Sequence, residues 1–177
     1  MRAYLYCTKN PAMGHLHYQG GGKWGVTDQK DGSYNGMIVA ECDIVAIERW
    51  KTFEADKDDD IDGVPYTITY RGAVKDIGYG RFASDRAERE ELTESSCVSM
   101  KGIISYAGGI GKTFYAWRLK GIELHADRLG PGESAPQSWR YFRDGVLLSI
   151  RPAFLALILN GEKTTEIRKS RFKKERK

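Results

Sequence analysis

The stretch from Val146 to Lys169 constrains the fold most, because it combines three elements in a short span. The apolar run Val146–Ile150 predicts a strand. Pro152 suits the first turn of a helix that runs to Asn160, and Gly161 suits its C-terminal end. Lys163–Lys169 then predicts a second strand. A strand, a helix, a glycine stop and a strand form a compact unit whose helix covers one end of a sheet.

The rest of the chain predicts mainly strands, with two short helices, and therefore an α+β fold. We expect strands at Ala3–Cys7 (half-buried), Met37–Ile47, Val64–Arg71 and Phe114–Leu119, the last extended or followed by Gly121–His125. We expect helices at Ser84–Thr93 and Met100–Tyr106, a Gly-rich loop at 10–36, an acidic loop at 54–63 and a linker at 130–145.

The segment Gly108–Thr113 looks like a nucleotide-binding P-loop because it ends in Gly-Lys-Thr. The P-loop pattern requires a glycine where this chain has Tyr106. A strand should precede the loop and a helix should follow it, whereas the pattern here predicts the reverse order. We therefore interpret the segment as a helix end and a tight turn, with Lys112 exposed to solvent.

Length and composition describe an ordinary globular chain. With 177 residues, of which 41% are hydrophobic, it is long enough for one domain with a full core. No apolar run reaches membrane-spanning length, and the N-terminus lacks a signal-peptide core. Cys7, Cys42 and Cys97 are widely spaced, which favours free thiols in a cytoplasmic protein. We expect Cys97 to be a small buried residue.

The positive charge is concentrated at one end. Lys163–Lys177 carries eight basic and two acidic residues, a net charge of +6, so the remaining chain has 20 basic and 22 acidic residues, a net charge of −2. A basic segment of this kind suits a polyanionic partner, although a solvated tail that keeps the protein soluble is the alternative.

Metal sites are not predicted. Asp58, Asp60 and Asp62 match half of a calcium loop, but the position that should hold the final Glu is Thr69. His15 and His17 lack a third ligand at useful spacing. We expect neither a metal nor another cofactor.

Several motifs of this chain resemble the ASCH family, a group of PUA-like β-barrels. Leu147–Pro152 and the helix after it are followed by Gly161, Lys163, Glu166 and Arg168, in the Gly-x-Lys-x-x-Glu-x-Arg spacing of the family's opening unit. The family's later motifs resemble Tyr6-Cys7-Thr8-Lys9, Gly36–Glu41, Ser96-Cys97 and Tyr115-Ala116-Trp117, which all precede that unit here.

The resemblance therefore implies a circularly permuted ASCH domain that occupies residues 1–177. Residues 146–177 would form the opening unit with the basic tail, residues 1–129 the later barrel elements, and residues 130–145 the linker. The expected fold is a small mixed or antiparallel PUA-like β-barrel with peripheral helices. A truncated tandem, completed by a domain-swapped homodimer, is the alternative to closure within one chain.

The resemblance also suggests a nucleotide-sized cleft. Lys9, Lys163 and Arg168 would attract phosphate, while Tyr6 and Trp117 would stack on a base. Glu166 and Arg168 share a strand face and could pair. The full set of expected binding residues is Tyr6, Thr8, Lys9, Trp117, Arg151, Lys163, Thr164, Glu166, Arg168, Lys169 and Arg171.

Two classes of function are compatible with this resemblance. The first is a module that binds RNA or another single-stranded nucleic acid. The second is a hydrolase acting on RNA or on an N4-acylated cytidine nucleoside, with Lys163 and Glu41 transferring protons. Glu166 stands where the hydrolase subgroup carries a threonine, which weakens the second class. A protein-interaction domain without a ligand is a third possibility, and it would be supported if Trp117 and Tyr6 filled the cleft.

Overall fold

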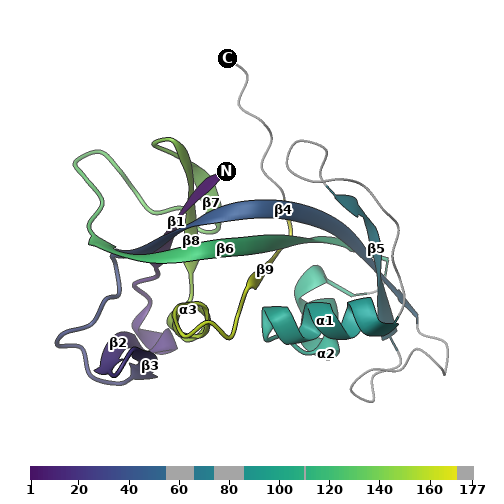
Figure 1. Ribbon diagram of the computed structural model, residues 1–177, viewed down its shortest axis with the longest axis horizontal. Coiled ribbons are helices and arrows are strands. Elements are labelled where there is room, and N and C mark those ends of the chain that lie inside the picture. The colour runs from purple at the N-terminus through teal and green to yellow at the C-terminus, as the bar shows by residue number, and fades with distance from the viewer. Residues whose placement is uncertain (55–65, 74–85, 110, 171–177) are drawn as a thin grey trace. The chain divides into compact units, whose positions relative to one another are not determined.

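The computed structural model describes residues 1–54, 66–73, 86–109 and 111–170 (Figure 1). The fold is α+β, as the sequence predicts. The strands are β1 (Arg2–Cys7), β2 (His15–Gly20), β3 (Lys23–Thr27), β4 (Ile38–Glu54), β5 (Tyr66–Ala73), β6 (Thr113–Asp127), β7 (Trp139–Phe142), β8 (Gly145–Ile150) and β9 (Thr165–Arg168). The helices are the 3₁₀ turn η1 (Pro11–Met13), α1 (Arg86–Ser96), α2 (Met100–Ala107) and α3 (Pro152–Leu159).

A seven-stranded mixed sheet has the order β7-β8-β1-β4-β6-β9, with β5 paired to β4, and β2 and β3 form a separate hairpin. The chain divides into two compact units. Unit 1 contains Met1–Ile44 and Lys120–Lys163, and unit 2 contains Val45–Leu119 and Thr164–Lys177. β4 and β6 each contribute residues to both units.

In unit 1, β1 runs parallel to β8 and antiparallel to β4. The expectation that β1 is half-buried is wrong, because both of its faces are covered. Ala3 and Leu5 are fully buried, and on the other face Tyr4 and Tyr6 are only 7% and 4% exposed. Phe142 packs against these two tyrosines.

Two segments expected to be irregular contain strands. The predicted linker 130–145 holds β7, which pairs with β8 from Trp139↔Leu148 to Phe142↔Gly145. The predicted Gly-rich loop 10–36 holds the β2–β3 hairpin. Both strands gain their stability from pairing with another segment, which local composition does not reveal.

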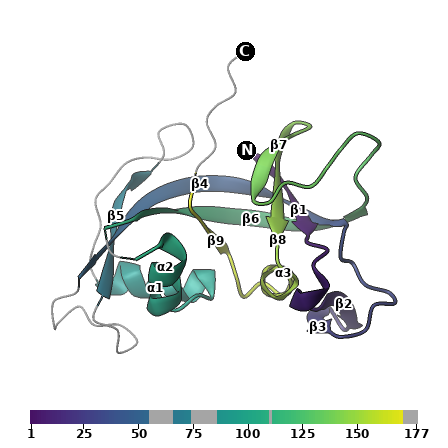
Figure 2. The ribbon, with the colours of Figure 1, turned by 180° about the vertical axis from the view of Figure 1, so that it is seen from behind.

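The hairpin is attached to the end of α3, and the two lie side by side in Figures 1 and 2. The Asn160 side chain accepts a hydrogen bond from the Trp24 backbone N–H (2.8 Å) and donates one to the Trp24 carbonyl (2.9 Å). The C-cap residue of α3 thus pairs with both backbone polar groups of Trp24, and these two hydrogen bonds position the hairpin. The predicted strand–helix–strand order of the C-terminal unit is confirmed, although its last strand begins only at Thr165.

In unit 2, α1 and α2 supply apolar side chains to a core with Trp50, Phe114 and Ile167. The prediction for α2 is confirmed in detail. The Ser99 side chain accepts a hydrogen bond from the Gly102 N–H (3.1 Å), and Gly108 ends the helix with a φ of 102°. Serine caps and left-handed glycine stops are local signals, so they could be recognised from sequence.

Within the described part of the chain, no helix has the length and apolar character needed to cross a lipid bilayer. Of the predicted acidic loop at 54–63 only Glu54 is described, and it is the last residue of β4. Residues 55–63, with the half calcium loop at Asp58, Asp60 and Asp62, lie outside the described residues.

Candidate nucleic-acid interface

A basic and aromatic cluster lies at the C-terminal end of α2 in unit 2, and we call it the α2 cluster. It consists of Tyr106, Lys112 and Lys169. The Tyr106 side chain is 41% exposed, and the Lys169 ammonium lies 5.2 Å from the centre of its ring. The Lys112 side chain passes beside Gly108, two residues after Tyr106. Both lysines are exposed.

The loop between α2 and β6 holds Lys112 in place through Thr52 of β4. The Thr52 hydroxyl donates to the Gly109 carbonyl (2.7 Å) and accepts from the Lys112 N–H (3.0 Å), and the Gly111 N–H donates to the Thr52 carbonyl (2.9 Å). A helix precedes this loop and a strand follows it, so the interpretation of the loop as a turn rather than a P-loop is confirmed.

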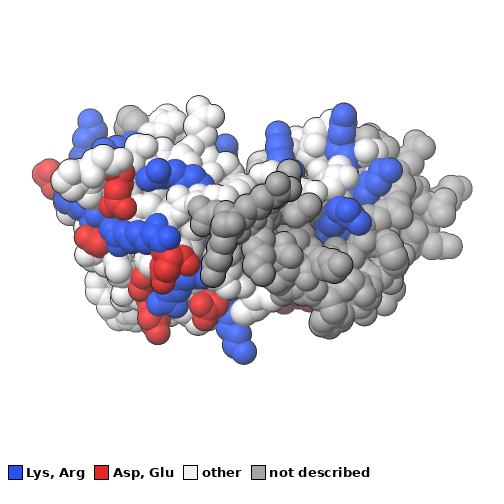
Figure 3. Space-filling model, turned by 90° about the horizontal axis from the view of Figure 1, so that it is seen from above, with Lys and Arg blue, Asp and Glu red and all other residues white. Residues whose placement is uncertain are grey.

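Exposed basic residues also occur elsewhere in unit 2, at Arg49 on β4 and Lys101 on α2. In Figure 3, Lys and Arg side chains stand apart from acidic ones in one part of the visible face and alternate with them in another. The acidic residues Glu90, Glu91 and Glu94 belong to α1. Among the described residues of unit 2, these exposed acidic side chains and the exposed basic ones therefore lie on different elements.

The predicted site residues of unit 2 are largely buried. Trp117 is fully buried, and its indole N–H donates to the Ser170 carbonyl (3.1 Å). Glu166 and Arg168 form the expected ion pair at 3.0 Å, and each side chain is only 8% exposed. Of these predicted residues, Thr164 and Lys169 are exposed, and Arg171 lies outside the described residues.

The predicted site residues of unit 1 also divide between surface and core. Lys9 and Arg151 are exposed. Tyr6 is buried, and this burial raises the pKa of its hydroxyl. Lys163 is 1% exposed, with its ammonium 4.7 Å from the centre of the Phe154 ring.

Thr8 lies in the same unit, and its hydroxyl is buried without a hydrogen-bond partner among the described residues. The expectation that Tyr6 and Trp117 present open stacking faces is wrong, because both rings belong to the core.

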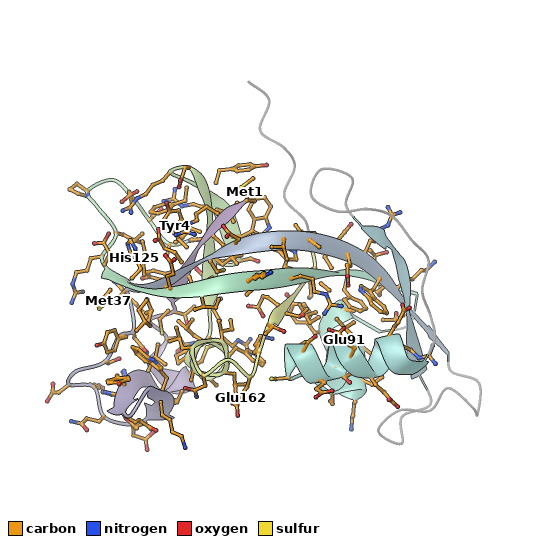
Figure 4. All side chains as sticks on the ribbon, in the orientation of Figure 1. Met1, Tyr4, Met37, Glu91, His125 and Glu162 are labelled. Atoms are coloured by element: carbon orange, nitrogen blue, oxygen red, sulfur yellow. The ribbon has the colours of Figure 1, made fainter. Side chains whose placement is uncertain are left out.

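Glu41 lies in a network that sequence reasoning did not foresee. It pairs with Arg2 (3.2 Å) and with Nδ1 of His125 (3.1 Å). Tyr4 packs edge-on against His125, as the labelled side chains in Figure 4 show, and donates its hydroxyl proton to Asp144. Lys163 has different surroundings, so the structure gives no support to a Lys163–Glu41 proton-transfer pair.

Arg118 is a second residue that the sequence reasoning missed. Its guanidinium donates to Glu48 (2.8 Å), Glu91 (2.8 Å) and the Thr165 hydroxyl (2.8 Å). These bonds join β6 to β4, α1 and β9 within unit 2. Such a network uses most of the donors of the guanidinium, so Arg118 has a structural role.

All three cysteines are free thiols, as expected. Burial raises the pKa of Cys7 and of Cys42 to about 12, which disfavours the reactive thiolate. Cys97 is exposed, so the expectation that it is buried is wrong. It lies in the turn that follows α1, with a φ of 55°.

Among the described residues, no group of three or more His, Cys, Asp or Glu side chains is placed to hold a metal ion. His15 Nδ1 lies 3.3 Å from the Ser33 hydroxyl, and His17 Nε2 lies 2.6 Å from the Gln29 carbonyl. Both imidazoles thus contact residues of the loop that follows the hairpin.

Comparison of the chain with protein-family models, with curated proteins and with solved structures gave no match.

Proposed function

We propose that this protein binds single-stranded nucleic acid, with RNA as the expected ligand. The observation that carries the proposal is the exposed Tyr106 ring with the Lys169 ammonium 5.2 Å from its centre. Proteins that bind single strands combine aromatic faces, which stack on bases, with basic side chains, which contact phosphates. The α2 cluster provides both kinds of group within one unit.

The charge distribution supports the same partner. Lys169 is the last exposed lysine before the basic residues of 171–177, so the α2 cluster continues in sequence into the segment that carries the excess charge. Electrostatic attraction to phosphate is the main source of affinity that does not depend on base sequence. A solvated tail alone would not require an aromatic ring beside its first lysine.

The order of the ASCH-like motifs is further support, and a permuted PUA-like barrel is part of the proposal. In this proposal residues 146–177 correspond to the family's opening unit. The permuted barrel is completed within one chain rather than in a domain-swapped dimer, and the protein acts in the cytoplasm. The hydrolase alternative has less support, because Lys163 and Glu41 have separate surroundings.

The direct test is the binding of a fluorescent single-stranded RNA of about twelve nucleotides, measured by anisotropy at about 50 mM and about 200 mM salt. We expect binding that weakens steeply with salt, that is stronger than binding to the same sequence as a duplex, and that leaves the RNA intact on a denaturing gel.

Absence of binding at the lower salt concentration would refute the proposal. If the wild-type protein cleaves the RNA and Lys163→Ala does not, the hydrolase function would replace the proposal of binding without turnover. A folded control is needed in the second case, because Lys163 is buried and its removal alters the core.

A further inference from the structure

Unit 1 contains an aromatic pocket that the proposed function has not used. It lies between the β2–β3 hairpin, the end of α3 and the second half of β6, and its cavity volume is about 380 Å³. Three aromatic rings line it, those of Tyr18, Trp24 and Tyr34, together with aliphatic side chains that include Leu124 and Ile158. This volume is within the usual range of small-molecule sites, about 300–1,000 Å³.

The three rings are fixed against one another. The centroids of Tyr18 and Trp24 are 5.2 Å apart, and those of Trp24 and Tyr34 are 4.9 Å apart with planes at 72°. Trp24 is 8% exposed and is held by its two backbone bonds to Asn160. Tyr18 is 49% exposed, and its hydroxyl accepts a hydrogen bond from the Gly22 N–H (2.9 Å). The pocket therefore has a rigid floor and an accessible ring at its edge.

Two of the lining side chains are well exposed. Leu124 is 66% exposed and Tyr18 is 49% exposed. Large apolar side chains that gather at an aromatic pocket mark a binding surface more often than scattered ones do. Glycines also contribute to the lining. A Cβ added at Gly22 or at Gly161 would meet no atom within 4 Å, so the backbone there is open to a ligand.

The chemical character of the lining favours a flat, uncharged heterocycle. Within the described part of the chain, the Trp24 indole N–H and the Tyr34 hydroxyl have no hydrogen-bond partner, so two pocket residues retain polar groups for a ligand edge. Aromatic faces and a few such polar groups are how proteins hold an unstacked base. None of the described lining residues is acidic, so the lining offers no carboxylate to pair with a charged ligand.

We infer that this pocket binds one unpaired nucleobase of the single-stranded ligand. The inference rests on the proposed function, but it uses a different unit and different residues. Phosphate contacts at the α2 cluster would set the salt dependence of binding, whereas the pocket would add to the preference for strands that carry bases, beyond the stack that Tyr106 provides. The proposed occupant of the pocket is a base of a single strand. Binding of a second protein chain at the pocket would contradict this inference.

The test compares two oligomers of about twelve nucleotides with equal charge, one with ordinary bases and one with an abasic sugar at every position. Wild type should bind the base-containing oligomer on the order of tenfold more tightly than the abasic one. Tyr18→Leu, which removes an exposed ring but keeps an apolar side chain, should reduce that preference and leave abasic binding unchanged. Tyr18→Phe is the matched control, since it keeps the ring and loses only the hydroxyl.

The possible results of this comparison distinguish failure of the proposed function from failure of the pocket inference. If neither oligomer binds, the proposed function fails and the inference fails with it. If Tyr18→Leu keeps the preference, the proposed function stands and the pocket inference is overturned. If both oligomers bind equally well to wild type, base stacking is overturned both at Tyr106 and in the pocket. Concentration-dependent self-association that is lost in Tyr18→Leu, without a base preference, would also overturn it.

A second measurement follows the wild-type protein itself during the titration. The chain has four tryptophans, so the indole N–H signals in a ¹⁵N spectrum are few, and a spectrum of Trp24→Phe serves only to assign the Trp24 signal. The Trp24 signal should shift on addition of the base-containing oligomer and stay in place with the abasic one. An unchanged Trp24 signal at saturating oligomer would contradict the inference.

Discussion

The ammonium of Lys169 lies 5.2 Å from the centre of the Tyr106 ring, at the point where β9 has just ended and the basic residues of the C-terminus begin. The contact joins a helix end to a strand end within unit 2. A cation over an exposed aromatic ring contributes only about 0.5–1 kcal/mol to stability. We therefore expect substitutions here to change ligand binding much more than folding.

Replacing Tyr106 with leucine should weaken binding of single-stranded RNA by on the order of tenfold, because one base–aromatic stack contributes about 1–3 kcal/mol. Anisotropy titration at fixed salt measures the effect. Ser105→Ala is the control, since Ser105 is an exposed neighbour on the same helix. Equal losses in the two variants would contradict a stacking role for the ring.

Thr52→Val should destabilise the loop that holds Lys112. The substitution keeps the side-chain shape but removes a hydroxyl that bonds both Gly109 and Lys112. Because Thr52 is fully buried, the unpaired loop groups should lower the free energy of unfolding by about 1–3 kcal/mol. Urea unfolding measures this value, and Thr52→Ser should recover most of it. A Thr52→Val protein as stable as wild type would show that these bonds contribute nothing.

Breaking the buried pair of Glu166 and Arg168 should be costly. Removal of one partner leaves the other charge in the core, which typically lowers stability by about 3–5 kcal/mol. Arg168→Met should therefore unfold at a much lower denaturant concentration than wild type. The double variant Glu166→Gln with Arg168→Met should lose less free energy of unfolding than the sum of the losses in the two single variants. Additive losses would mean that the two side chains do not interact.

Stability should fall at alkaline pH because of Tyr4. Its hydrogen bond to Asp144, followed by burial, raises the pKa of the hydroxyl from 10.0 to about 12. The folded protein thus keeps a proton that the unfolded chain releases. This stabilisation is fully present below pH 10 and is lost as the pH rises towards 12. Tyr4→Phe should flatten the decline in the free energy of unfolding over that range, and an unchanged slope would contradict this origin.

Only Cys97 should react rapidly with a thiol reagent in the folded protein. Cys7 and Cys42 are buried, and this burial raises their pKa to about 12. Titration with a chromogenic disulfide near neutral pH should modify one thiol per chain quickly and all three after unfolding. Cys97→Ser should abolish the rapid phase. Fast modification of a second thiol in native protein would show that the core around β1 opens readily.

Local signals in the sequence were sufficient for α2 and for the order of the C-terminal elements. Ser99, Gly108 and Pro152 act within a single turn, so their meaning does not depend on distant residues. The two missed strand pairs, β2–β3 and β7–β8, depend on partners that composition alone does not specify. The Gly-rich segment and the proline-containing linker therefore looked irregular.

The candidate site was harder to predict for the same physical reason. Trp117 and Tyr6 were expected to be exposed because they occur in motifs, but their neighbours in the fold bury both rings. Tyr106 could have been found, because it lies outside the apolar face formed by Ile103 and Ile104. The aromatic pocket could not have been found, since it joins a hairpin, a helix end and a strand that are far apart in sequence.

The most direct measurement is the salt dependence of single-stranded RNA binding by wild type, Lys169→Ala and the control Arg128→Ala, an exposed basic residue of unit 1 that does not line the pocket. Each phosphate contact adds about 0.7 to the slope of log affinity against log salt for a single strand. If the α2 cluster contacts phosphate, Lys169→Ala should weaken binding and reduce this slope by about 0.7, whereas Arg128→Ala should match wild type. Equal slopes for wild type and Lys169→Ala, or no RNA binding by wild type, would contradict the proposed function.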